Sequence, residues 1–194
     1  MRLERPTKEL VEEYRRRFDA KNSADEDAIK ELFKIFPDNK DYKAVLLKSI
    51  VINTLYYTQI RAISIVAKHI LELDIDARLQ QGDPQLVDRI AIMTIKGKGD
   101  GKEKKRRNYS FATKYCSFHQ PSSYPIYDSI VDKILRAYQK QDSFSPEPLG
   151  DLKDYRRFKE VLEVFVSFYK DLGKPRWKDL DCFLHDYGKE NFAK

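Results

Sequence analysis

Residues 43–73 decide the fold class, and they read KAVLLKSIVINTLYYTQIRAISIVAKHILEL. The apolar residues of this stretch lie nearly all the way round a helix, which indicates burial rather than a surface stripe. The stretch is also too long for one ordinary globular helix. We therefore expect a break near Asn53-Thr54, with Thr58 as the cap of a second helix that ends at about Leu73.

Helical patterns continue on both sides of this stretch, and no segment alternates convincingly between apolar and polar residues. The sequence therefore predicts an all-α fold of about eight helices. A length of 194 residues suits a single domain, with 1–42 plus 140–194 and 43–139 as candidate subdomains. The other expected helices cover residues 7–18, 25–36, 85–94, 109–119, 129–139, 152–172 and 177–187.

The composition excludes several classes of protein. Hydrophobic residues make up 41% of the chain, which is too apolar for a disordered chain. The two cysteines, Cys116 and Cys182, are too few for a disulfide framework, an iron–sulfur cluster or a zinc ribbon. The N-terminus has no apolar signal segment, and Arg61 and Lys68 interrupt the most apolar run before it reaches membrane-spanning length. We expect a soluble, intracellular monomer of the cytoplasm or nucleoid, with no membrane partner.

A basic segment at residues 96–107 reads KGKGDGKEKKRR and carries seven basic against two acidic residues. Its alternating glycines disfavour a helix and allow backbone N–H groups to approach phosphates, while lysine and arginine release counterions on binding. With a formal net charge of +6 for the chain, this segment predicts a DNA contact. The alternative is a solvated, mobile loop. The candidate DNA-binding residues are Lys96, Lys98, Lys102, Lys104, Lys105, Arg106, Arg107 and Asn108.

Lys114 is the candidate nucleophile. On a helix, Phe111, Tyr115 and Phe118 form one apolar stripe, and Lys114 lies on the shoulder of that stripe. Desolvation and neighbouring cations lower the pKa of an amine, which is how a protein makes a nucleophilic lysine near neutral pH. The alternative is a lysine whose stem covers the edge of the core while its amine reaches water.

Asp128 is the second candidate catalytic residue. It follows Tyr124-Pro125 and precedes an expected helix, so its carboxylate projects from a helix start. The alternative is an ordinary N-cap that satisfies a backbone N–H group of that helix.

Together these segments resemble the helix-hairpin-helix DNA glycosylase superfamily, including its bifunctional 8-oxoguanine-type members. Thr113-Lys114 is similar to the family's nucleophile position, and residues 125–128 (PIYD) to its aspartate segment. Residues 45–59 resemble the buried helix and the short polar wedge segment that follows it. The resemblance covers residues 43–138. It departs from the family where the Leu-Pro-Gly-Val-Gly hairpin is replaced by the basic segment 96–107, and the spacing from Lys114 to Asp128 is shorter than usual.

The resemblance implies a two-layer helical fold and a glycosylase that flips a damaged or modified nucleotide out of duplex DNA. Lys114 would attack the sugar with Asp128 assisting, an AP-lyase step would follow, and no metal or organic cofactor would be needed. An unusual modified base, as in foreign DNA, is an extension of this hypothesis. The residues expected at the wedge or in the base pocket are Asn53, Tyr56, Tyr57, Gln59 and His119, with core packing as the alternative for the tyrosines.

Two other functions remain open from the residues alone. One is a non-catalytic nucleic-acid-binding helical protein that uses the basic segment 96–107. The other is a hydrolytic nuclease, which would need clustered carboxylates to hold a divalent metal ion, and no compelling cluster stands out in the sequence. Substitution of Lys114 distinguishes the glycosylase from the binder.

Overall fold

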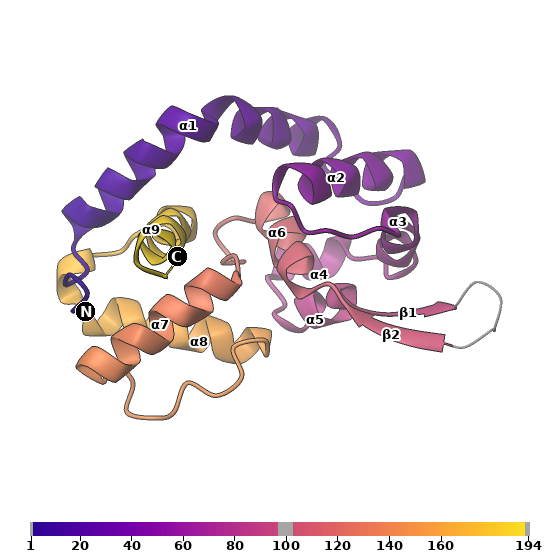
Figure 1. Cartoon of the computed structure of the whole chain (residues 1–194). Coiled ribbons are helices and arrows are strands. Elements are labelled where there is room, and N and C mark those ends of the chain that lie inside the picture. Colours follow the sequence, from indigo (N-terminus) through magenta and orange to yellow (C-terminus); the bar gives the residue numbers. More distant parts are fainter. Residues whose placement is uncertain (1, 97–102, 193–194) are drawn as a thin grey trace. The chain divides into compact units, whose positions relative to one another are not determined.

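The computed structural model describes residues 2–96 and 103–192, which form nine α-helices, one 3₁₀ helix and a two-stranded antiparallel sheet (Figure 1). The prediction of an all-α fold is confirmed. The two-layer, glycosylase-like arrangement stays a prediction. The elements are α1 (Lys8–Ile35), α2 (Tyr42–Leu55), α3 (Ile63–Glu72), α4 (Asp76–Gln81), α5 (Gln85–Ala91), β1 (Ile92–Lys96), β2 (Glu103–Arg107), α6 (Tyr109–His119), α7 (Ser129–Asp142), α8 (Tyr155–Phe168), the 3₁₀ helix η1 (Lys170–Leu172) and α9 (Trp177–Phe192).

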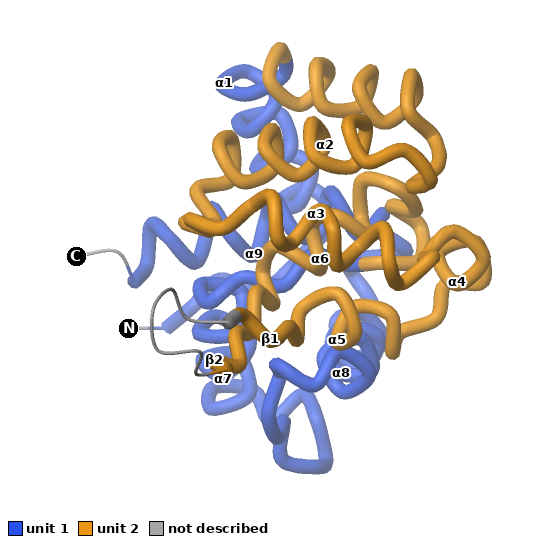
Figure 2. The backbone as a smooth tube through the Cα atoms, turned by 90° about the vertical axis from the view of Figure 1, so that its right-hand side faces the viewer, with its two compact units in different colours: residues 1–23, 125–194 blue, residues 24–124 orange. Residues whose placement is uncertain are grey.

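The chain forms two compact units, which Figure 2 shows in different colours. The central unit consists of residues 24–124, and the terminal unit combines residues 1–23 with residues 125–194. The helix α1 runs through the boundary and contributes to both. None of the helices in the described ranges combines the length and apolar content that a bilayer crossing requires.

The helix α1 is continuous, so the prediction of two helices at 7–18 and 25–36 is wrong. Asn22, near the expected break, donates from its side-chain amide to the Phe18 carbonyl oxygen at 3.0 Å, within the helix itself. This bond satisfies a polar side chain that otherwise competes with helix formation. Ion pairs four residues apart add support along the helix, and they join Lys8 to Glu12, Glu13 to Arg17, Arg15 to Asp19 and Glu26 to Lys30.

The apolar stretch forms the core of the central unit. The helix α2 begins after Asp41, whose carboxylate accepts from the Ala44 N–H group at 2.9 Å. The predicted break is confirmed, but Thr58 is not the cap of the next helix, because the N-cap position of α3 is Ala62. Residues from α2, α3, α5 and α6 are fully buried together, and they include Val45, Ile52, Val66, Ile70, Ile90, Phe111 and Tyr115.

A β-hairpin follows α5, where the sequence analysis placed the end of a helix and a loop. The helix ends at Ala91, and β1 pairs with β2 so that Ile92 lies opposite Arg107. Figure 1 shows the two strands extending away from α5 and α6. Every residue of β2 is exposed and charged, so its sequence carries no apolar alternation that would reveal a strand. The strand is formed by backbone hydrogen bonds to β1, and the pattern of side chains does not indicate this pairing.

The terminal unit has an aromatic core. Tyr138 from α7, Phe165 from α8 and Phe183 from α9 are fully buried. The ring of Tyr138 packs edge-on against that of Phe165, with centroids 5.4 Å apart. Aspartates begin both α7 and α8, as the cap positions require. The expected helix at 152–172 is divided at Tyr169 into α8 and η1.

Close packing of α9 against α7 makes Gly188→Ala a test of this unit. A Cβ atom at position 188 would lie 2.7 Å from Cγ2 of Ile130. The helix propensity of alanine favours the change by about 1 kcal/mol, but overpacking costs about 1–3 kcal/mol. We expect a net loss of about 1 kcal/mol in the free energy of unfolding, measured by urea denaturation. The exposed neighbour Lys189→Ala is the control, and equal stability of Gly188→Ala and wild type would contradict the packing.

Candidate functional site

Lys114 is buried on α6 in the central unit. Its side chain is 4% exposed, and its Nζ atom donates to Oγ of Ser110, one turn earlier, at 2.7 Å. The same atom lies 5.6 Å from the centre of the Tyr56 ring, a cation–π distance. The amine is therefore held against the connection between α2 and α3 rather than reaching freely into water.

That connection also presents an exposed aromatic side chain, which belongs to the residue after Tyr56. Tyr57 follows Tyr56 directly, is 82% exposed and has a φ of 48°. Gln59 also has a positive φ, of 57°. Residues other than glycine adopt this conformation at a cost, and they keep it only where the surroundings hold it. The connection between α2 and α3 is therefore built in a conformation that holds an aromatic ring out toward solvent.

Asn53 is the side chain that holds this connection. Its Oδ1 atom accepts from the Thr58 hydroxyl at 2.7 Å and from the Ile60 N–H group at 2.9 Å, and its Nδ2 atom donates to the Ile60 carbonyl at 3.0 Å. Three of the four hydrogen-bonding positions of the amide are thus used within the loop. Asn53 therefore shapes the loop, and its place at the wedge or in a base pocket stays a prediction.

The hairpin carries a group of exposed cations in the central unit. Lys104, Lys105 and Arg106 are exposed and form no ion pair with any residue that the structure describes. Arg107 differs, since it pairs with Asp88 at 2.9 Å. Lys96 is the last residue of β1, and Lys98 and Lys102 lie outside the described residues. Asn108 stands at the N-cap position of α6, but its amide donates to Sδ of Met93 at 3.3 Å and does not cap the helix.

Asp128 begins α7 in the terminal unit. Its carboxylate accepts from the Ile130 N–H group at 2.9 Å, which is the contact of an N-cap. Lys114 belongs to the central unit, so the two candidate catalytic residues lie in different units.

A buried lysine that the sequence analysis did not single out forms the centre of a polar network. Lys48 on α2 is fully buried, and its Nζ atom donates to the carbonyl oxygens of Phe36 at 3.1 Å and Asp38 at 2.7 Å. The third acceptor is Oδ1 of Asn39 at 2.8 Å. Burial lowers the pKa of Lys48 to about 8, although the carboxylates of Asp76 and Asp38 oppose that shift. The sequence feature that could have revealed this buried residue is the position of a lysine in the middle of the most apolar stretch.

Asn39 connects this lysine to α4 and α6. Its backbone N–H group and its Nδ2 atom donate to the two carboxylate oxygens of Asp76 at 3.0 and 2.6 Å. Its Oδ1 atom also accepts from the Tyr115 hydroxyl and lies 3.2 Å from Nε2 of His119. Asn39 lies in the connection between α1 and α2 and forms hydrogen bonds with residues of α2, α4 and α6. The network therefore holds these four helices together.

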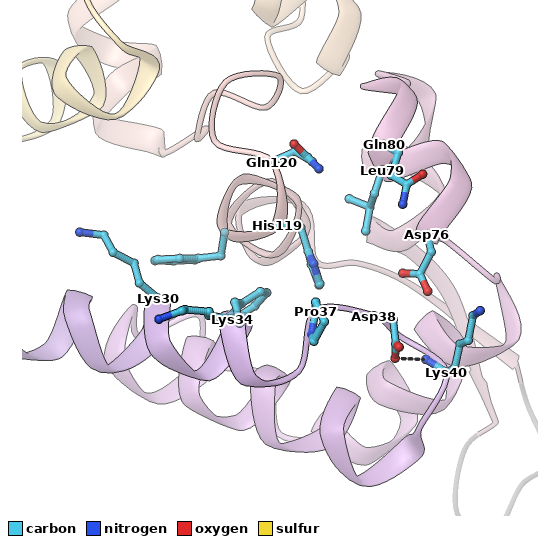
Figure 3. A pocket seen from close by; sticks show the side chains of 12 residues that line it. Lys30, Lys34, Pro37, Asp38, Lys40, Asp76, Leu79, Gln80, His119 and Gln120 are labelled. Atoms are coloured by element: carbon cyan, nitrogen blue, oxygen red, sulfur yellow. Dashed lines mark hydrogen bonds between the residues drawn. The ribbon is translucent and has the colours of Figure 1, made fainter.

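His119 is neutral in this network. Burial and the nearby charge of Lys48 lower the pKa of His119 to about 3. Its Nε2 atom lies 3.2 Å from Oδ1 of Asn39 and 3.3 Å from Nζ of Lys48, so this nitrogen faces both an acceptor and a donor. The other nitrogen, Nδ1, forms no hydrogen bond with any described residue. His119 also lines a pocket on the α4 side of α6 (Figure 3).

Residues 10–123 match the protein family described as HI_0787_N, an N-terminal domain. The chain belongs to this family. The chain is also 47% identical over 143 residues to a Haemophilus influenzae (strain ATCC 51907 / DSM 11121 / KW20 / Rd) protein named "Uncharacterized protein". That match covers 73% of this chain and 65% of the relative, so the chain spans just under two thirds of the relative's length. No solved structure matches the chain. The family match ends one residue before the central unit does.

The buried network predicts that Lys48→Met destabilises the protein by about 2–4 kcal/mol. The methionine fills the same space but leaves the carbonyl oxygens of Phe36 and Asp38 without their donor and removes one of the donors to Oδ1 of Asn39. The free energy of unfolding in urea measures the effect. Lys43→Met, at an exposed position of the same helix, is the matched control and should change stability by less than about 0.5 kcal/mol. Equal effects of the two substitutions would contradict the assigned role of Lys48.

Proposed function

We propose that the protein is a DNA glycosylase with AP-lyase activity, as its resemblance to the helix-hairpin-helix superfamily implies. The observation that supports this proposal best is the pairing of a buried amine with an exposed aromatic. Lys114 lies against Tyr56, and Tyr57, the next residue, is held out toward solvent. A base-flipping enzyme with a lysine nucleophile needs both. The nucleophile must reach the sugar, and a side chain must fill the space that the flipped nucleotide leaves among the stacked bases.

The proposed reaction begins with attack of the neutral amine of Lys114 on C1′ of the flipped nucleotide. The new Nζ–C1′ bond forms as the bond between C1′ and the base breaks, and the base leaves with its electron pair and takes up a proton. The sugar ring then opens at the C1′–O4′ bond to give a Schiff base, from which the lyase step eliminates the 3′-phosphate. Asp128 would stabilise the positive charge that develops on the sugar.

The hairpin would bind the DNA backbone in this proposal. Lys104, Lys105 and Arg106 are exposed side chains of β2. Such residues contribute sequence-independent affinity by displacing counterions from phosphates. They would keep the duplex next to the α2–α3 connection while the side chain of Tyr57 enters the stack of DNA bases.

A second candidate function is non-catalytic binding of nucleic acid through the hairpin. It is favoured by the same three cations, Lys104, Lys105 and Arg106, which form no ion pair within the described part of the chain. In this case Lys114 would be a structural residue whose stem and amine pack against Tyr56. The two functions differ in whether Lys114 reacts.

Borohydride trapping on DNA that contains an abasic site tests the reactive lysine without knowledge of the target base. We expect wild type to form a covalent adduct and Lys114→Gln to lose it by about a hundred-fold or more, since the amine supplies the bond. Lys68→Gln, at an exposed lysine of α3, is the control and should trap like wild type. Thermal melting checks that Lys114→Gln is folded. Absence of an adduct with wild type, or an undiminished adduct with Lys114→Gln, would refute the mechanism.

Salt dependence of DNA binding tests the hairpin. Replacement of Lys104, Lys105 and Arg106 by serine should reduce the slope of log affinity against log salt concentration by about 2.7, because each phosphate contact contributes about 0.9. Fluorescence anisotropy with a labelled duplex measures the slope. The Lys68→Gln control should keep the wild-type slope. A triple variant with an unchanged slope would show that the hairpin does not contact the backbone.

A further inference from the structure

A pocket of about 610 Å³ opens beside the buried network in the central unit (Figure 3). It lies among the end of α1, the connection that follows it, α4 and the end of α6. Its volume falls within the range of about 300–1,000 Å³ that small-molecule sites occupy. Lys114 and Tyr56 are not among its lining residues, so the pocket is separate from the proposed nucleophile.

The polar groups of this pocket converge on its centre. Figure 3 shows the side chains of Asp76, Gln80, Gln120 and His119 surrounding one space. The two glutamine amides form no hydrogen bond with any described residue. Each oxygen of Asp76 accepts one hydrogen bond from Asn39 and so retains a lone pair. The site therefore combines a fixed acceptor, the Asp76 carboxylate, with two adaptable amides and the imidazole of His119.

The remaining lining fits a flat ring with a charged tail. Phe33, Phe118 and Leu79 provide apolar surface, and Phe33 and Phe118 contact each other at 5.5 Å between centroids. Lys34 and Lys40 lie at the exposed rim. Aromatic and apolar side chains favour a heteroaromatic ring, and lysine ammonium groups at the rim favour a phosphate on it.

We propose that this pocket binds a nucleobase that carries an exocyclic amino group, presented as a nucleoside monophosphate. The amino group and a ring N–H group donate to the two oxygens of Asp76, the glutamine amides bind the remaining edge, and the phosphate faces Lys40. Carboxylates read amino groups of bases in this way. Guanine fits best, because its amino group and ring N–H group are adjacent donors. The proposal goes beyond the lysine chemistry and does not depend on it.

Isothermal titration of the full-length protein with guanosine, adenosine, cytidine and uridine monophosphates tests the proposal. We expect guanosine monophosphate to bind at least about ten-fold more tightly than uridine monophosphate, which lacks an amino group; ten-fold corresponds to about 1.4 kcal/mol. Inorganic phosphate alone should show no saturable binding at the same concentrations. Equal affinity for guanosine and uridine monophosphates, binding of phosphate alone as strong as that of the nucleotides, or no nucleotide binding would overturn the proposal.

Paired variants locate the binding in this pocket. Gln80→Leu combined with Gln120→Leu should weaken guanosine monophosphate binding by about ten-fold, because both amides lose their hydrogen bonds to the base. Gln81→Leu, the next residue on α4 and not part of the lining, is the matched control. Unchanged affinity in the double variant would overturn the assignment. Lys114→Gln should bind the nucleotide like wild type, so failure of the lysine chemistry and failure of this pocket are separable.

Discussion

The central unit depends on one buried ammonium group. Lys48 is removed from water, and three carbonyl oxygens replace its hydration. An unpaired buried charge costs several kcal/mol, so the chain around it cannot rearrange without losing these bonds. The Phe36 carbonyl lies just beyond the last turn of α1, where the negative end of a helix dipole also favours a cation. The end of α1 and the buried face of α2 are therefore fixed to each other by electrostatics as well as by packing.

The same constraint orients α6, the helix that carries both sites. Tyr115 and His119 reach the Lys48 network through Asn39, which fixes the rotation of α6 about its axis. On a helix whose rotation is fixed, Lys114 is directed to the neighbouring face, where Tyr56 meets it. Phe118 contacts both Tyr56 and Phe33, which lines the pocket. The amine and the pocket are thus connected through two aromatic side chains, Tyr56 and Phe118, and a ligand that moves Phe118 would also displace Tyr56.

Local signals in the sequence predict the elements well and their long-range partners poorly. The break in residues 43–73, the helix that carries Lys114 and the cap at Asp128 all depend on residues a few positions apart, and the structure has all three. The continuous α1 and the hairpin were missed, because charged residues specify neither a helix end nor a strand. The Lys48 network was missed for a different reason. Its bond from Tyr115 to Asn39 joins residues 76 positions apart, and no periodicity encodes such a contact.

Two buried lysines lie in the central unit, and their surroundings argue for different roles. All three N–H groups of Lys48 are directed at carbonyl oxygens, so attack by its amine on a substrate would require the network to open. Lys114 instead meets a hydroxyl group and an aromatic face beside a loop with an exposed tyrosine. A hydroxyl group can accept a hydrogen bond from either the charged or the neutral amine. Lys104, Lys105 and Arg106 of the hairpin differ again, since they are exposed and form no ion pair with a described residue. Burial and the available acceptors, rather than the number of charges, therefore distinguish the structural lysine from the proposed nucleophile and from these exposed cations.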